Sequence, residues 1–248
     1  MKNTIALLMT LIPLALGGCQ KSAPVVEDTK AATPIIAAKS SASAENPIVV
    51  ELYQSQGCSS CPPANAAVNA VADQPGVIAL SFAVTYWDRL GWKDVFGDKA
   101  YTQRQYDYAH ALGNANVATP QIIINGKAAI TGIKQGELAR NIAASAPLAK
   151  GPTIDLDKDK VNIGKGNGPA NIWLVRYDPR TQNVAIRSGE NTGRTLPHKN
   201  IVRSLTKLGE WNGPAASFNL PAASSSQLKT VILVQRAGAG PIIAAKTI

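Results

Sequence analysis

Two cysteines separated by two residues, Cys58 and Cys61, are the side chains of this sequence best placed to do chemistry. A thiolate attacks a disulfide, and a neighbouring second thiol can then release the mixed disulfide that the attack forms. A bridge between two such close cysteines closes a very short loop, so it stabilises a fold little compared with a long-range bridge. The spacing therefore favours a redox pair, with Cys58 as the nucleophile and Cys61 as the resolving thiol, over a structural disulfide.

The third cysteine, Cys19, follows an apolar stretch over residues 4–16. That stretch is too short to span a membrane, which needs about 20 apolar residues, and it is typical of a secretory signal. Two glycines before Cys19 resemble a bacterial lipobox, so we expect removal of residues 1–18 and a lipid on Cys19. An ordinary secretory signal with an incidental cysteine is the alternative. Gln20 favours a periplasm-facing anchor in the outer rather than the inner membrane.

The segment over residues 19–46 contains mostly Ala, Lys, Ser, Thr and Pro and no aromatic residue. Such a composition cannot bury a core and predicts a flexible tether. The net charge is +9, and the basic residues are scattered along the chain. This pattern predicts a solvated surface or a basic face toward anionic lipid or cell wall, and export excludes nucleic acid as a partner.

Strand and helix patterns alternate up to about residue 148. Hydrophobic periodicity and turn residues predict these elements: strands at 48–53, 77–85, 121–124 and 128–130, and helices at 64–72, 99–112 and 135–144. A right-handed crossover makes the first two strands parallel neighbours, and we expect Tyr101, Tyr106 and Tyr108 to face inward. After Pro147 only short apolar segments recur between turns, at 154–156, 171–177, 183–187, 200–205 and 230–235, and each predicts a strand. The sequence thus predicts an α/β domain at 47–148, with a mixed sheet flanked by helices, and an antiparallel all-β module at 149–248.

Several short motifs accompany the cysteine pair: Tyr86-Trp87-Asp88, Leu90-Gly91-Trp92, Thr119-Pro120-Gln121, Asn125-Gly126, and Gly189-Glu190-Asn191 with Gly193-Arg194. With the segment at 50–63, they resemble an exported thioredoxin-like family catalogued as domain of unknown function 1223. The resemblance covers roughly residues 48–245. It implies a thioredoxin-like fold for the α/β domain, and it leaves the activity open.

The resemblance also implies roles for individual residues. The Thr119–Pro120 bond matches the cis-proline that faces the active site in thioredoxin-like proteins, where Pro120 offers a docking surface; a proline that merely begins a strand is the alternative. Glu51 resembles the buried thioredoxin aspartate, with a spacing one residue longer. It is either a proton shuttle to Cys61 or an exposed strand residue. Two prolines after Cys61 place the helix start near Cys61 and weaken the help that the helix dipole gives to the first thiol.

Trp87 and Asp88 follow the second predicted strand, and Cys58 follows the first. Because the carboxyl ends of parallel strands meet at one edge of a sheet, we expect Trp87, Asp88 and Thr119 to shape a substrate surface beside the cysteines. Simple packing is the alternative for the tryptophan. His110 and His198 are expected to be ordinary polar residues.

Three functions remain open at this point. The first is a thiol–disulfide oxidoreductase that acts on an exported protein, needs a redox partner and uses no cofactor beyond its Cys58–Cys61 disulfide. The second is a metallochaperone-like module that holds Cu(I) between the two sulfurs, since soft thiolates suit this ion. The third is a non-enzymatic lipoprotein scaffold, because fold alone does not determine function. The direction of electron flow cannot be read from the sequence.

Overall fold

A mixed sheet organises the part of the chain that the computed structural model describes, residues 42–133 and 136–248. The helices are α1 (Pro62–Val71), η1 (Asp88–Leu90), α2 (Lys99–Ala111) and α3 (Glu137–Ala144). The strands are β1 (Ile48–Gln54), β2 (Val77–Ala83), β3 (Gln121–Ile124), β4 (Ala128–Thr131), β5 (Ile154–Asp157), β6 (Lys160–Ile163), β7 (Ala170–Asp178), β8 (Gln182–Ala185), β9 (Thr195–His198), β10 (Ile201–Trp211), β11 (Ala216–Asn219), β12 (Lys229–Arg236) and β13 (Ile242–Thr247). The predicted signal, the lipidation site at Cys19 and most of the predicted tether lie outside the described residues.

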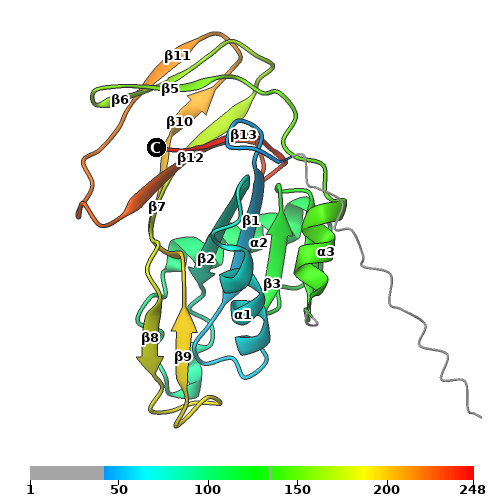
Figure 1. Cartoon of the computed structure of the whole chain (residues 1–248), viewed down its shortest axis with the longest axis vertical. Coiled ribbons are helices and arrows are strands. Elements are labelled where there is room, and N and C mark those ends of the chain that lie inside the picture. Colours follow the sequence, from blue (N-terminus) through cyan, green and yellow to red (C-terminus); the bar gives the residue numbers. More distant parts are fainter. Residues whose placement is uncertain (1–41, 134–135) are drawn as a thin grey trace, which may run out of the picture. The chain divides into compact units, whose positions relative to one another are not determined.

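Eight strands form the large sheet, in the order β13-β12-β7-β10-β2-β1-β3-β4 (Figure 1). β1 is buried at all seven positions and pairs parallel with β2, as the continuous apolar runs predict. β3 runs antiparallel to β1 and turns into β4 at Asn125 and Gly126, whose φ angles of 51° and 65° are those that favour Asn-Gly in a hairpin. The fold is therefore mixed α/β, as predicted.

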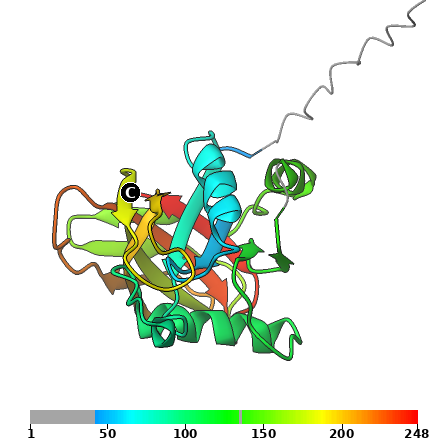
Figure 2. The ribbon, with the colours of Figure 1, turned by 90° about the horizontal axis from the view of Figure 1, so that it is seen from below.

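Helices cover both faces of the part of the sheet that β1 to β4 form (Figure 2). α1 and α3 pack on one face through Ala64, Val68, Leu138 and Ile142. α2 begins at Asp98, whose carboxylate accepts a hydrogen bond from the Ala100 N–H. It lies on the opposite face. Because β1 and β2 run parallel, the loop from β1 into α1 and the loop from β2 into α2 both begin at the same end of these strands.

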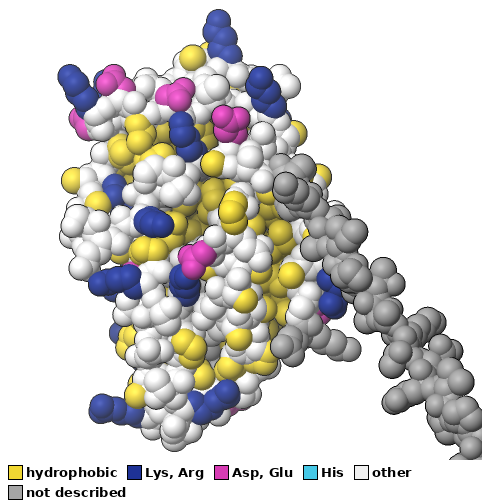
Figure 3. All heavy atoms as spheres, viewed as in Figure 1, with side chains coloured by type: hydrophobic (Ala, Val, Ile, Leu, Met, Phe, Trp, Pro, Cys, Tyr) yellow, Lys and Arg dark blue, Asp and Glu magenta, His cyan; other side chains and the backbone are white. Residues whose placement is uncertain are grey.

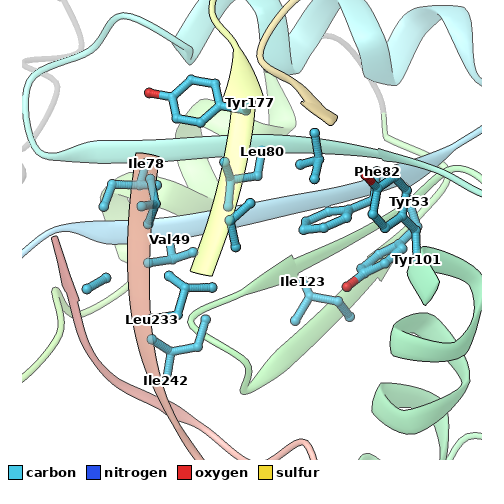
Figure 4. Close-up of a cluster of buried hydrophobic side chains, with 14 of the residues drawn as sticks. Val49, Tyr53, Ile78, Leu80, Phe82, Tyr101, Ile123, Tyr177, Leu233 and Ile242 are labelled. Carbon is cyan, nitrogen blue, oxygen red and sulfur yellow. The ribbon is translucent and has the colours of Figure 1, made fainter. Parts of the chain in front are cut away.

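The core beneath α2 is rich in aromatic rings (Figure 4). Tyr53 stacks on Phe82 with 5.3 Å between ring centroids, and Tyr101 meets Phe82 edge to face at 5.4 Å. The prediction that Tyr106 also faces inward is wrong, because its side chain is 47% exposed. The helical period places Tyr101, Tyr108 and Ala109 on the buried face, and Tyr106 falls outside that stripe.

Strands from the second half of the chain join the same sheet. β10 pairs parallel with β2 at Ile201 and Ser81, and β7, β12 and β13 follow it in antiparallel order. A separate three-stranded sheet, β11-β6-β5, packs over these strands, and β8 pairs with β9 in a two-stranded sheet. The domain boundary near residue 148 stays a prediction, but strands on its two sides share one sheet.

Lys and Arg side chains are spread over the face in Figure 3 and do not gather in one patch. This distribution fits the scattered basic residues of the sequence. Among the described helices, none has the length and apolar character needed to cross a membrane.

Candidate functional site

The cysteine pair lies in the turn between β1 and α1. Cys58 and Cys61 form a disulfide, with 5.4 Å between their Cα atoms. Cys61 is the N-cap residue, and α1 begins at Pro62, so the expected helix start near Cys61 is confirmed. The Cys61 N–H donates to the Cys58 carbonyl at 3.2 Å, which closes the turn.

Both sulfurs are covered in this structure. Cys58 is 0% and Cys61 1% exposed, whereas the intervening Ser59 and Ser60 face solvent. The Ser60 hydroxyl lies 3.3 Å from the Cys58 sulfur, and the Thr119 carbonyl oxygen lies 3.7 Å from it. A thiol in solution therefore reaches the disulfide only if part of this cover moves.

The Thr119–Pro120 segment lies directly against the cysteine turn. Its peptide bond is cis, as the family resemblance implies. The Trp87 indole N–H donates to the Thr119 hydroxyl at 2.7 Å, so the loop after β2 reaches across to this segment. The structure thus brings Cys58, Trp87, Thr119 and Pro120 together, although Pro120 itself is buried.

A buried carboxylate that the sequence analysis missed, Asp94, supports the turn from below. It accepts the Gln56 N–H at 2.7 Å and the Phe96 N–H at 2.9 Å, and it is 1% exposed. Burial raises the pKa of Asp94 to about 6. Asp88, a predicted site residue, accepts the Asp94 N–H at 3.1 Å. Asp88 therefore supports the loop that holds the cysteine turn.

The connection between β8 and β9 also forms hydrogen bonds to the cysteine turn. The buried Asn191 amide donates to the carbonyls of Gln56 and Cys58, both at 2.8 Å. Glu190 accepts the Ser59 N–H at 3.0 Å and the Ser59 hydroxyl at 2.7 Å. These four bonds join segments more than 130 residues apart in the chain.

Glu51 lies away from these contacts. It is fully buried, so the alternative of an exposed strand residue is wrong. Its carboxylate accepts the Arg104 Nε–H at 2.8 Å and the Tyr108 hydroxyl at 2.5 Å. Burial acts against the charge of Arg104, but Glu51, Tyr108 and Tyr53 together raise its pKa above the ordinary value. None of the hydrogen bonds described for Glu51 reaches a cysteine, so its role as a proton shuttle stays a prediction without a supporting contact.

His198 lies closer to the site than the sequence indicated. Its Nδ1 is 3.3 Å from the Asn65 amide nitrogen, and Asn65 stands one helical turn after Cys61. Burial lowers the pKa of His198 to about 4, so the ring is neutral at pH 7. His110 is exposed on α2, as expected of an ordinary polar residue.

The residues that the sequence analysis missed had weak signals. Glu190 and Asn191 stood in a recognised motif, but nothing in their spacing linked them to Cys58. Asp94 and Asn65 belong to no motif, and only the fold brings them beneath the turn. No group of three or more His, Cys, Asp or Glu side chains suited to a metal ion occurs in residues 42–133 and 136–248.

A family model described as "Protein of unknown function (DUF1223)" matches residues 49–235. The chain belongs to this family. This DUF1223 chain is similar to a protein from Agrobacterium tumefaciens whose crystal structure is known. The two sequences are 30% identical, the match covers 84% of this chain and 94% of the other, and the TM-score is 0.66. HBP35 of Porphyromonas gingivalis is 12% identical, covers 84% of this chain and 76% of its own, and has a TM-score of 0.53, which is a likeness of fold alone. No curated protein matches.

Proposed function

We propose that this DUF1223 protein is an exported, lipid-anchored thiol–disulfide oxidoreductase that acts on protein substrates. The observation that carries the proposal is the Cys58–Cys61 disulfide at the start of α1, beside the carbonyl that precedes the cis-proline Pro120. The order β1-α1-β2-α2-β3-β4-α3, with β1 and β2 parallel, supports a thioredoxin-like unit. The anchor and the outer-membrane location rest on residues 1–20 of the sequence.

The chemistry needs no cofactor besides the two sulfurs. The Cys58 thiolate attacks a substrate disulfide, forms a mixed disulfide and releases one substrate thiolate, which takes up a proton. Cys61 then loses its proton and attacks the Cys58 sulfur, which releases the second substrate thiol and leaves the protein disulfide. The protein loses two electrons, the substrate gains them, and a separate redox partner must restore the dithiol.

The cover over the disulfide must open for this reaction. The segment over residues 188–194, which we name the clamp loop, holds the backbone of the cysteine turn, so its release would let the turn and its disulfide move. The clamp loop lies in the connection between β8 and β9. Within the described residues these two strands pair only with each other, so the loop can move without breaking a strand pairing of the large sheet. The clamp loop is bound to the cysteine turn by the hydrogen bonds of Asn191 and Glu190.

Trapping tests the proposal. A Cys61→Ser variant cannot resolve the mixed disulfide, so it should retain its substrate protein in a covalent complex that is identified by mass and released by reductant. The matched control, Cys58→Ser, should trap nothing. An equal yield of complexes from both variants, or none from either together with no exchange on a peptide disulfide, would overturn the proposal.

Burial of both sulfurs favours a second candidate, a scaffold lipoprotein in which the disulfide does no exchange. In that case Cys58→Ser would leave partner binding unchanged and the disulfide would resist mild reductants. Cu(I) binding stays a prediction that no contact favours over exchange. Anaerobic titration of the reduced protein with Cu(I) against a competing chelator tests it.

A further inference from the structure

Several backbone donors around Cys58 are absent or are committed to other acceptors. The Ser59 N–H points to Glu190, and the Cys61 N–H points to the Cys58 carbonyl. The first two residues of α1, Pro62 and Pro63, have no N–H at all. Four of the backbone positions that could offer an N–H to a Cys58 thiolate are therefore absent or occupied.

Glu190 adds a negative charge at the same place. Its carboxylate accepts two hydrogen bonds from Ser59, and these bonds lower the pKa of Glu190, so it is ionised at pH 7. Among the described residues no cation lies within ion-pair distance of Glu190. Arg194, the basic residue of the same loop, instead donates to the Asn191 side chain at 2.8 Å.

We propose that Glu190 opposes ionisation of Cys58 and so keeps the reduced pair in its dithiol form at pH 7. An anion disfavours a second anion beside it, and a destabilised thiolate makes the dithiol easier to oxidise. The Ser60 hydroxyl lies 3.3 Å from the Cys58 sulfur and 3.3 Å from the Thr119 carbonyl, so it can donate to either. The inference rests on the proposed function, and it names a residue that limits the thiolate population at that site.

The size of the effect follows from the distance. The Ser59 nitrogen is four covalent bonds from the Cys58 sulfur and 3.0 Å from the Glu190 carboxylate, so the carboxylate oxygen lies at most about 8 Å from the sulfur. One charge at that distance in a partly hydrated site shifts a pKa by about 0.5–1 unit. The other ionisable groups near the turn are Asp94, Asp88, Arg194 and the neutral His198, and the Glu190 substitution removes none of them.

The test is the pKa of Cys58 in the full chain with Cys19→Ser and Cys61→Ser, read from the ultraviolet absorbance of the thiolate. We expect a pKa at or above about 8.5, the ordinary value for a cysteine thiol. Glu190→Gln should lower it by about 0.5–1 unit. Glu210→Gln, which removes another exposed carboxylate, serves as the matched control and should leave it unchanged.

A second readout is the equilibrium between the disulfide and dithiothreitol, measured with Cys61 intact. Glu190→Gln should favour the reduced form by about 3- to 8-fold at pH 9 and by less than about 1.3-fold at pH 7, because the thiolate is populated only at high pH. A wild-type pKa well below 7, or a pKa unchanged in both Glu190→Gln and Glu190→Ala, would overturn the inference. Because absorbance needs no substrate, this result is independent of the trapping experiment.

Discussion

The buried carboxylate beneath the cysteine turn gives the stability of the protein a specific pH dependence. Asp94 is nearly inaccessible, and both of its oxygens accept backbone N–H groups, from Gln56 and Phe96. Burial nevertheless dominates and raises its pKa from 3.8 to about 6. The folded protein therefore binds the Asp94 proton more tightly than the unfolded chain does.

The sign and size follow from this difference. Asp94 contributes stability that is fully present below pH 3.8 and is lost as the pH rises through about 6. A difference of about 2 units corresponds to about 3 kcal/mol, at about 1.4 kcal/mol for each unit. Asp94→Asn removes the titration, and its amide can still accept one of the two N–H groups.

The assay is urea unfolding of the oxidised protein at several pH values for wild type and Asp94→Asn. The free energy of unfolding of the variant, minus that of wild type, should rise by about 2.4 kcal/mol between pH 4 and pH 7. Whatever constant penalty the lost hydrogen bond imposes, it cancels in this comparison. A difference that stays constant within about 0.5 kcal/mol would refute the reasoning, because Asp94 would then titrate alike in both states.

Three further predictions concern neighbouring residues. For His198→Asn, the free energy of unfolding of the variant minus that of wild type should instead fall as the pH rises. The reason is that the lowered pKa of His198 removes stability from wild type as the pH falls from 6.5 to about 4. Urea unfolding at the same pH values checks this, and a difference that does not change with pH contradicts it. Arg104→Met should lower the free energy of unfolding by about 3–5 kcal/mol, because it leaves the buried Glu51 carboxylate without its cation; a loss below about 1 kcal/mol in urea unfolding would argue against this. Asn191→Ala should speed reduction of the disulfide by dithiothreitol about 5- to 30-fold, because it frees the carbonyls of Gln56 and Cys58; an unchanged rate would show that the clamp loop does not limit access.

Much of the first half of the fold followed from local patterns. Continuous apolar runs gave the parallel strands β1 and β2, and Asn125-Gly126 gave the hairpin. The strands β6, β9, β11 and β13 were not predicted. Three of them have four residues each, and β9 contains Pro197, so neither alternation nor composition could mark them.

The candidate site divides in the same way. The two cysteines, Pro120 and Trp87 belong to motifs that are visible in the sequence, and the structure places them together. Glu51 was given a role by its position along one strand, but Arg104, which comes from a helix far along the chain, determines what it binds. Asp94 and Asn191 act through backbone groups of the cysteine turn. Asp94 belongs to no motif, and the motif that contains Asn191 does not indicate which backbone groups it binds.

The central claim is that the covered disulfide exchanges electrons while the protein stays folded. The most direct test is the rate at which dithiothreitol reduces the Cys58–Cys61 bond under native conditions, compared with the rate of global unfolding of the same sample. We predict reduction much faster than unfolding, and a rate that Arg104→Met, which destabilises the fold elsewhere, leaves unchanged. Reduction that proceeds only at the rate of global unfolding, and that accelerates with Arg104→Met, would contradict the account.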